Sequence, residues 1–287
     1  MSDALTAPSR AGRDLPAWRR LLRERAALAG GGVVLAFIAV AIFAPLLAPW
    51  DPVASDWGAI REAPSLIHPF GTDDLGRDVL SRCIFGARSS LLAGFLSVVV
   101  ATLAGTPLGM LAGYFGGVLD VVISRCADAL LACPFLVLAI ALAAFLGPSL
   151  QNAMIAIGIS AAPLFIRLAR GQTLAVREEE YVAAAVSLGL PHRTILWSYI
   201  LPNILPPLIV QATLTVAIAV LAEASLAFLG LGQPPPDASW GSMLDAARQF
   251  LSDAPWMAVW PGLAIITVVI SFNLLGDALN DVLNPQD

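Results

Sequence analysis

Lysine is absent from this chain of 287 residues, so all 16 of its basic residues are arginines. The phosphate-binding loop G-x-x-x-x-G-K-[ST] requires a lysine that reaches the phosphates of ATP. A chain without lysine cannot bind and hydrolyse ATP through this loop. We therefore expect no catalytic residue in this chain and no cofactor held by it.

Histidine and cysteine are also scarce. The two histidines, His68 and His192, fall in predicted loops, so no H-E-x-x-H motif or Ser–His pair lies within an apolar segment. This argues against intramembrane proteolysis. The three cysteines, Cys83, Cys126 and Cys133, do not have the spacing of metal ligands, so the sequence predicts no metal site.

Charged residues make up only 13% of the chain and hydrophobic residues 58%. A soluble globular protein is about 25% charged and about 45–50% apolar. These proportions predict an integral membrane protein with lipid as its surroundings. The net charge of −5 is spread through loops, and no basic patch indicates a nucleic-acid partner.

A helix needs about 20 mostly apolar residues to cross a membrane, and this chain has room for six such helices. The segment at 129–166 is too long for one helix and is broken by Gly147-Pro148-Ser149, so it predicts two helices joined by a tight turn. The first apolar run is longer than the apolar region of a signal peptide, which has about 7–15 residues, and this predicts an uncleaved helix. The predicted spans lie at 26–50, within 89–119, twice within 129–166, at 206–222 and at 257–275.

Arginine placement predicts the orientation, because cytoplasmic segments carry an excess of basic residues. With the N-terminus inside, both termini are cytoplasmic and 11 arginines lie inside against five outside. The inner ones are Arg10, Arg13, Arg19, Arg20, Arg23, Arg25, Arg125, Arg167, Arg170, Arg177 and Arg193; the outer ones are Arg61, Arg77, Arg82, Arg88 and Arg248.

These positions divide the chain into four parts. A cytoplasmic tail (1–25) precedes the first transmembrane helix (26–50), and an acidic extracytoplasmic loop (51–88) follows it. The remainder, 89–287, is a core of five transmembrane helices. Within this core, the fourth and fifth of the six predicted spans are joined by a long cytoplasmic loop, 167–202.

Ionisable residues are rare within the predicted spans. Asp128 and Asp277 stand at predicted helix ends, where a carboxylate can reach the membrane interface. Glu223 directly follows the fifth predicted span and precedes another apolar stretch. It is therefore the candidate for a residue that lines a pathway or an outer vestibule. The alternative, an interfacial residue hydrogen-bonded to a neighbouring helix, is equally open.

The loop at 167–202 contains a predicted short helix at 181–188. Gly189 suits the left-handed position that ends a helix, and Pro191 prevents simple continuation. A second short helix is predicted at 194–200 and ends near Pro202. One face of the first helix carries residues at i, i+3, i+4 and i+7 spacing, namely Tyr181, Ala184, Ala185 and Leu188. Such a helix could dock in a groove on a partner or lie on the membrane interface.

This loop resembles the cytoplasmic E-A-A-x-x-x-G…I-x-L-P segment of ABC-importer permeases. Ala183-Ala184-Ala185 and Gly189 match its first half, and Ile200-Leu201-Pro202 approximates its second half. In the family this segment is the coupling helix that docks on a separate ATPase subunit. Ala183 stands where the family has glutamate, and Glu178, Glu179 or Glu180 is the candidate to supply the charge instead. The residues implied for coupling are Glu180, Tyr181, Ala183, Ala184, Ala185, Leu188, Gly189, Leu201 and Pro202.

Four other stretches are similar to permeases of the dipeptide, oligopeptide and nickel group, and most similar to the C-type permease subunit of dipeptide importers. They cover much of the chain after residue 45, so the combination is more specific than the coupling loop alone. The stretches read "HPFGTDDLGRDVLSRCIFGARSSL", "GYFGGVLDVVISRCADALLACPFLVLAIAL", "LAEASLAFLGLGQPPPDASWGSML" and "SFNLLGDALNDVLNP".

The resemblance implies an all-α permease with six transmembrane helices and the fold of ABC type I importers. It implies import of dipeptides or short oligopeptides across the bacterial cytoplasmic membrane, driven by ATP. The implied partners are a second permease that completes a heterodimer, two ATP-binding subunits that hold ATP and magnesium, and an extracytoplasmic peptide-binding protein. The open alternatives are nickel chelates or glutathione as substrate, an ion-coupled secondary carrier, and a structural subunit without a pathway.

Overall fold

The computed structural model describes residues 20–283, and every regular element within that range is a helix. The predicted tail 1–25 lies mostly outside the described residues. Five helices are long and apolar enough to cross a membrane, or six if one bent pair counts as a single span. The predicted all-α fold is confirmed, and the predicted number of six spans is reached by counting the bent pair as one.

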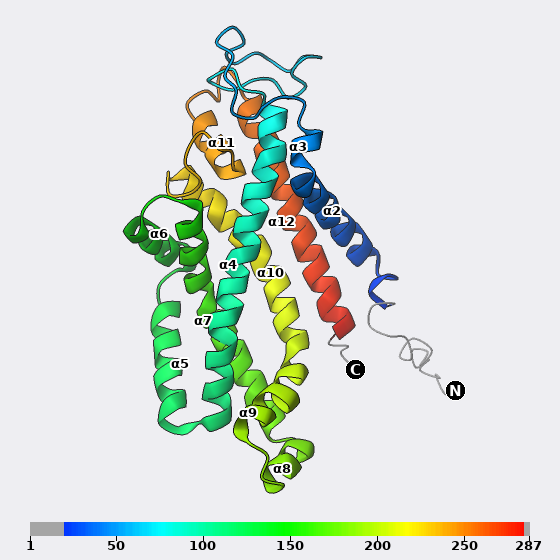
Figure 1. Cartoon of the computed structure of the whole chain (residues 1–287), viewed down its shortest axis with the longest axis vertical. Coiled ribbons are helices and arrows are strands. Elements are labelled where there is room, and N and C mark those ends of the chain that lie inside the picture. The colour runs from blue at the N-terminus through cyan, green and yellow to red at the C-terminus, as the bar shows by residue number, and fades with distance from the viewer. Residues whose placement is uncertain (1–19, 284–287) are drawn as a thin grey trace, which may run out of the picture.

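The bundle is built on α4 (Val79–Phe115), α7 (Leu150–Arg177) and α10 (Leu201–Phe228). Figure 1 shows α2 (Arg25–Ile42) and α12 (Trp256–Leu283) together along one side of these three helices. The helices α5 (Gly117–Leu131) and α6 (Phe135–Leu146) stand on the other side. One end of the bundle carries α8 (Glu180–Ser187). The opposite end carries the segment 48–78 and α11 (Trp240–Ala247).

The most extensive contact between helices joins α4 to α7, and glycine makes it possible. Gly105, Gly109 and Gly113 are spaced four residues apart and therefore lie on one face of α4. An added Cβ at Gly105 would lie 2.6 Å from the carbonyl oxygen of Ala162, and one at Gly109 would collide with that of Ile166. Glycines in this pattern let two helix backbones approach closely, which supplies the packing that drives helix association in a membrane.

The region between the second and fourth predicted spans differs from the prediction. The helix α4 ends at Phe115, and Gly116 and Gly117, with φ of 65° and 58°, turn the chain directly into α5 (Gly117–Leu131). Arg125, which was predicted in a loop, lies within α5. A bend of 92° then separates α5 from α6 (Phe135–Leu146).

The tight turn predicted at Gly147-Pro148-Ser149 is confirmed. The helix α6 ends at Leu146 and α7 begins at Leu150. Ser149 caps α7, because its Oγ accepts the backbone N–H of Asn152 at 3.1 Å. This cap satisfies one of the amide groups that the first turn of a helix leaves without a partner.

The helix α4 begins ten residues earlier than the predicted loop 51–88 allows. Asp78 is its N-cap, and the carboxylate accepts the backbone N–H and the hydroxyl of Ser81, both at 2.7 Å. The other carboxylate oxygen lies 3.0 Å from Nδ1 of His68. A local capping interaction therefore extends the helix to Val79, beyond the apolar run that marked its position in the sequence.

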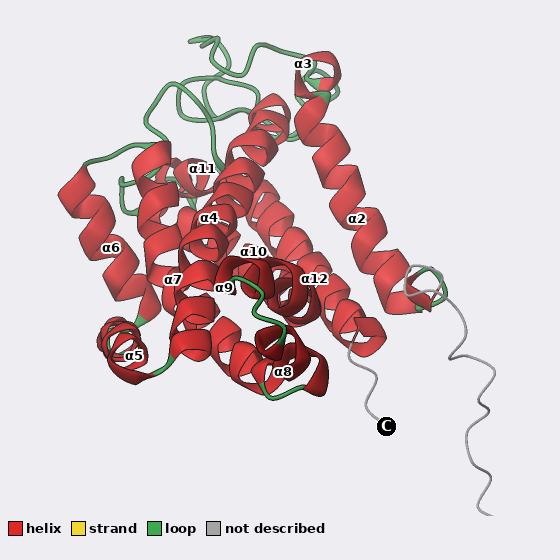
Figure 2. Cartoon of the chain, turned by 60° about the horizontal axis from the view of Figure 1, so that its bottom comes forward, coloured by secondary structure: helices red, strands yellow, loops and turns green. Residues whose placement is uncertain are grey.

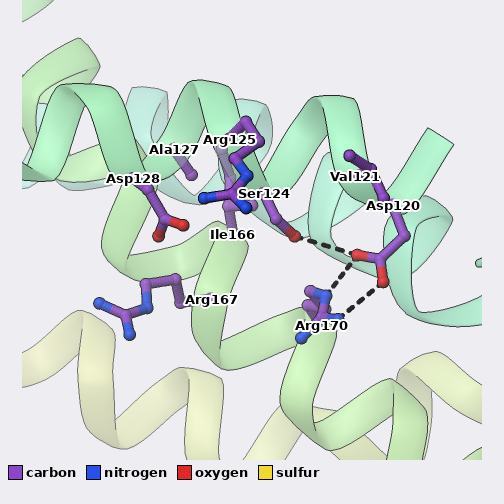
Figure 3. Close-up of a pocket in the computed structure, with 9 residues that line it drawn as sticks. All are labelled: Asp120, Val121, Ser124, Arg125, Ala127, Asp128, Ile166, Arg167 and Arg170. Carbon is purple, nitrogen blue, oxygen red and sulfur yellow. Dashed lines mark hydrogen bonds and ion pairs between the residues drawn. The ribbon is translucent and has the colours of Figure 1, made fainter. Parts of the chain in front are cut away.

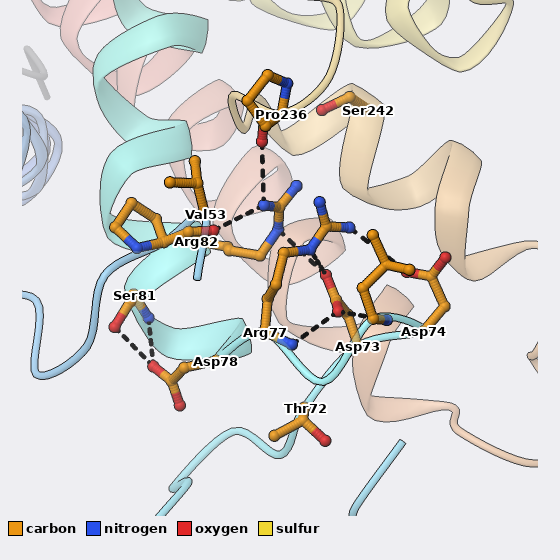
Figure 4. Close-up of polar contacts among 12 residues, drawn as sticks. Val53, Thr72, Asp73, Asp74, Arg77, Asp78, Ser81, Arg82, Pro236 and Ser242 are labelled. Atoms are coloured by element: carbon orange, nitrogen blue, oxygen red, sulfur yellow. Dashed lines mark hydrogen bonds and ion pairs between the residues drawn. The ribbon is translucent and has the colours of Figure 1, made fainter. Parts of the chain in front are cut away.

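The segment between α3 (Ala44–Leu47) and α4 is tied to the bundle by a buried polar cluster (Figure 4). The carboxylate of Asp73 accepts the Nε–H of Arg77 at 2.7 Å and lies 3.3 Å from Nε of Arg82. Arg82 also donates to the carbonyl oxygens of Pro52 at 2.8 Å and Pro236 at 3.3 Å. Arg82 on α4 thus joins the segment 48–78 to the chain that precedes α11. Because each buried charge in this cluster has a partner, the cluster is expected to hold these chain segments in one arrangement.

Candidate functional site

The helix α8 (Glu180–Ser187) forms the candidate coupling surface at one end of the bundle (Figures 1 and 2). Val182 and Ala185 are buried and belong to the same hydrophobic core as Ile195. Tyr181 is 42% exposed and Leu188 is 81% exposed. Of the predicted apolar face, Ala185 thus packs inward, whereas Tyr181, Ala184 and Leu188 remain accessible. The accessible residues are available to a partner.

Gly189 ends α8 in the predicted left-handed conformation, with φ of 72°. Its backbone N–H donates to the carbonyl oxygen of Val186 at 2.9 Å, and the N–H of Leu190 donates to that of Ala185 at 3.2 Å. These two hydrogen bonds form a Schellman motif, in which glycine is the favoured residue. An added Cβ would meet nothing within 4 Å, so the backbone conformation alone selects glycine here.

The three glutamates before and at the start of α8 differ in their surroundings. Glu178 forms an ion pair with Arg177, with Nη2 and Oε1 3.1 Å apart. Glu179 is the N-cap of α8, and Glu180 lies in its first turn, where a negative charge is favourable. All three side chains are exposed. Glu179 and Glu180 are therefore the better candidates for the charge that Ala183, itself exposed, cannot supply.

Side chains that the sequence analysis did not single out fasten this surface to α4. Arg177 donates from Nη1 to the carbonyl oxygens of Gly113 at 3.3 Å and Tyr114 at 3.2 Å. The hydroxyl of Tyr114 lies 2.8 Å from Nδ1 of His192, on the far side of α8 in the sequence. The chain segments before and after α8 are thus both attached to the last turn of α4. No local sequence signal indicates these contacts, because the partners lie more than 60 positions apart.

The second short helix was predicted to end near Pro202, and this prediction is wrong. The short turn α9 (His192–Thr194) continues through the π-helical turn η2 (Ile195–Ile200) into α10 without a break. Pro202 lies in the first turn of α10 and is exposed, and Leu201 packs against the core. Pro202 follows directly on the π-helical turn, where the regular hydrogen-bond pattern of the α-helix changes, and its missing N–H falls at that change. The coupling surface is therefore continuous with a membrane-spanning helix.

Glu223 lies within α10 and is fully buried. Its Oε2 accepts the hydroxyl of Ser90 on α4 at 3.0 Å, and the same hydroxyl oxygen accepts the backbone N–H of Trp240 on α11 at 3.2 Å. The second oxygen, Oε1, is buried without a hydrogen-bond partner among the residues described. These contacts agree with a residue that is hydrogen-bonded to a neighbouring helix. A role in a pathway stays a prediction.

Two further features of the structure concern metal binding and a cleft elsewhere in the bundle. In residues 20–283, no group of three histidine, cysteine, aspartate or glutamate side chains could hold a metal ion. A cleft lined by charged residues lies between α5 and α7, and it was missed by the sequence analysis. A usable signal was present, since Asp120, Ser124 and Asp128 are spaced four residues apart and therefore share one helix face.

Two family models match the chain. The model of the binding-protein-dependent transport system inner membrane component matches residues 105–286. The model of the N-terminal transmembrane domain of oligopeptide transport permease C matches residues 16–64. The first match alone covers more than half of the chain.

Relatives of known name align over nearly the whole length. The dipeptide transport system permease protein DppC of Alkalihalophilus pseudofirmus is 46% identical over 94% of this chain and 89% of its own length. The glutathione transport system permease protein GsiD of Pectobacterium atrosepticum is 43% identical over 94% and 90%. The probable D,D-dipeptide transport system permease protein DdpC of Escherichia coli is 45% identical over 88% and 85%.

A solved structure supports the fold. An inward-facing conformation of the MetNI methionine ABC transporter aligns with a TM-score of 0.59 at 20% identity. The alignment covers 71% of this chain and 97% of the other. The predicted importer-permease fold is confirmed by this likeness and by the family match. The chain belongs to the family of binding-protein-dependent transport system inner membrane components and is an ABC-importer permease.

Proposed function

We propose that this permease imports dipeptides or short oligopeptides across the bacterial cytoplasmic membrane, driven by ATP that separate subunits bind with magnesium and hydrolyse. The working complex contains a second permease, two ATP-binding subunits and an extracytoplasmic peptide-binding protein. Both termini and α8 lie on the cytoplasmic side. The distribution of arginines supports this orientation.

The observation that carries the proposal is the accessible surface of α8, attached on both sides to a membrane-spanning helix. A subunit that docks on Tyr181 and Leu188 acts on a helix whose flanking chain segments are bound to the last turn of α4. Movement of the docked subunit therefore moves α4 and, through η2, α10. This arrangement couples a nucleotide-dependent motion outside the membrane to helices within it.

Peptide as the substrate is supported by the relatives named for dipeptide transport. A relative named for glutathione transport is nearly as similar, and glutathione is itself a small peptide. Nickel chelates remain the more distant alternative. An ion-coupled carrier is disfavoured by membership of the ABC-importer family.

The test is reconstitution of the whole complex in proteoliposomes. We expect uptake of labelled dialanine to require the binding protein outside and ATP with magnesium on the side where α8 lies. A proton gradient without ATP should give no uptake. Uptake driven by the gradient alone would refute the proposal and favour an ion-coupled carrier.

The substrate class is tested separately with the cognate binding protein. Thermal unfolding of that protein is recorded with dialanine, with a longer peptide, with glutathione and with a nickel chelate. A ligand that binds the folded state stabilises it by an amount that grows with the logarithm of ligand concentration over Kd, so at equal concentration the tighter ligand gives the larger rise in unfolding temperature. We expect the largest rise with a dipeptide or short oligopeptide. A rise with the nickel chelate alone would contradict the peptide assignment.

A further inference from the structure

A charged cleft lies between α5 and α7 (Figure 3), and neither the residues of α8 nor Glu223 line it. Its volume is about 580 Å³. Five charged side chains line it: Asp120, Arg125 and Asp128 from α5, and Arg167 and Arg170 from α7. Figure 1 places α5 beside α7, on the side of the bundle that faces away from α2 and α12.

One pair of these charges is fixed. Arg170 donates from Nη2 to Oδ2 of Asp120 at 2.7 Å, and its Nε donates to Oδ1. Ser124 donates to the same Oδ1 at 3.0 Å. A two-pronged pair of this kind has one favoured geometry, so it holds α5 against α7. The pair also neutralises the charges of Asp120 and Arg170. Three of the five charged side chains of the cleft therefore remain outside this pair.

The three remaining side chains are Arg125, Asp128 and Arg167. Within residues 20–283, none of them has an ion pair within 4.0 Å or a side-chain hydrogen bond, and all three are exposed. Figure 3 shows Arg125 and Asp128 on α5 with Arg167 across from them on α7. The cleft thus presents two guanidinium groups and one carboxylate to a ligand.

These charges lie on helices that are otherwise apolar. Val118 and Val122 on other faces of α5 are 79% and 53% exposed, as suits contact with lipid. Arg167 is ten residues from the end of α7, which is about 15 Å of helix rise. The arginine count predicts that this end of α5 and α7 lies on the cytoplasmic side, so charged side chains there face water, lipid headgroups or another protein rather than hydrocarbon.

The signs of the free charges indicate the chemistry of the ligand. A guanidinium binds a carboxylate through two parallel hydrogen bonds, and an aspartate binds an ammonium. A metal ion would be repelled by the two arginines, and a simple anion by Asp128. A molecule with a carboxylate at one end and an ammonium at the other uses all three groups.

Resting on the proposed function, we infer that this cleft is a peptide site of the transport pathway: Arg125 and Arg167 bind the terminal carboxylate, and Asp128 binds the terminal ammonium. Arg125 and Asp128 stand about one helical turn apart on α5, about 4.5 Å of helix rise, and both side chains are exposed. An extended dipeptide, at about 3.4 Å for each residue, spans about 7 Å, a distance that the long Arg125 side chain covers when it points away from Asp128. The site lets a peptide released from the binding protein stay hydrated and oriented on its way through the permease.

The test uses the complete complex in proteoliposomes, with uptake of labelled dialanine and ATP hydrolysis recorded together. We expect Arg167→Gln, Arg125→Gln and Asp128→Asn each to lower uptake per ATP hydrolysed about 10-fold, as loss of a charge-assisted hydrogen bond does. Stimulation of ATP hydrolysis by the loaded binding protein should persist, because that step does not use the cleft. Thermal unfolding should also stay unchanged, since within residues 20–283 these three exposed side chains make no side-chain hydrogen bond and no ion pair within 4.0 Å.

Matched controls remove the same charges elsewhere. Arg88→Gln on α4 and Asp277→Asn on α12 alter exposed residues outside the cleft, and both should transport like the wild type. Wild-type uptake together with unaffected cleft variants would refute the inference and leave the proposed function intact. Failure of the wild type to import dialanine with ATP would instead refute the proposed function, and this inference with it.

A phospholipid headgroup also carries a negative and a positive group, so the assay is repeated in two lipids. One set of vesicles contains phosphatidylcholine alone, and the other contains phosphatidylethanolamine and phosphatidylglycerol. We expect the cleft variants to be equally defective in both. A wild-type complex that loses uptake in phosphatidylcholine to the level of the variants would assign the cleft to a lipid and overturn the inference.

Discussion

At the scale of single residues, Glu223 connects three helices through one carboxylate oxygen. The hydroxyl of Ser90 on α4 donates to it, and the backbone of Trp240 on α11 donates to that hydroxyl. Sequence reasoning identified Glu223 as unusual because it stands beside apolar residues. It could not supply the surroundings, because Ser90 lies 133 positions away and α11 is a separate element.

Substitutions of Glu223 separate a joint between helices from a pathway residue. Glu223→Gln keeps the size of the side chain and an oxygen that accepts from Ser90, so we expect assembly and uptake to persist. Glu223→Ala leaves the Ser90 hydroxyl without its acceptor and should lower the free energy of unfolding by about 1–3 kcal/mol. Thermal unfolding and peptide uptake of both variants check this. Altered uptake by the glutamine variant at unchanged stability would return Glu223 to the pathway.

Gly189 offers a second test at this scale. Gly189→Val forces a β-branched residue to a φ of 72°, which costs about 1–3 kcal/mol of local strain. That is too little to unfold the bundle but enough to shift α8 relative to a docked subunit. We expect an assembled complex whose ATP hydrolysis no longer drives uptake.

The controls for Gly189 are one substitution at the same position and one nearby. Gly189→Asn should be mild, because asparagine adopts left-handed conformations more readily than other residues with a side chain. Ala183→Glu restores the family pattern at an exposed position and should be tolerated. Full uptake by the valine variant would remove the coupling role from α8.

At the scale of elements, the helix boundaries show which signals are local. The turn at Gly147-Pro148-Ser149 was predictable because the breaker residues stand at the break itself. The first turn of α4 was not, because it contains Arg82, a charge whose partners lie on distant chain segments and which therefore looks like part of a loop in the sequence. The helix α5 was missed for a similar reason: Asp120 is matched by Arg170, 50 positions away.

The contact of α4 with α7 gives a prediction about helix packing. Gly109→Ala places a Cβ against the backbone of Ile166, so the two helices must separate. Overpacking of this kind typically costs about 1–3 kcal/mol, and we expect a clearly lower unfolding temperature. The matched control is Gly171→Ala on α7, where an added Cβ meets nothing within 4 Å.

Alanine is favoured over glycine in a helix by about 1 kcal/mol, so Gly171→Ala should be neutral or stabilising. Unfolding of the purified permease in detergent, followed by circular dichroism, compares the two variants. Equal stability of both would show that the glycines of α4 do not set the distance between the helices.

At the scale of the whole molecule, the sequence predicted the fold class and the family well. Apolar runs, breakers and family segments are all encoded locally, and the family models match residues 16–64 and 105–286, which include every family segment except the one at 68–91. The orientation in the membrane stays a prediction, and a reporter can test it. A reporter that is active only outside the cytoplasm should be active when fused after Trp57 and silent after Glu180, because the segment 48–78 and α8 lie at opposite ends of the bundle. Activity at the second position would contradict the proposed orientation.

The length of α4 has a thermodynamic consequence. This single helix of 37 residues carries the Arg82 contacts and the Asp78 cap at one end and the Tyr114 contacts beneath α8 at the other. In the proposed complex, a protein docked on α8 and a binding protein docked on the segment 48–78 act on opposite ends of this one helix, so their binding free energies are coupled. Linkage then requires reciprocity: the factor by which nucleotide state changes affinity for a binding protein outside equals the factor by which that protein changes affinity for nucleotide inside.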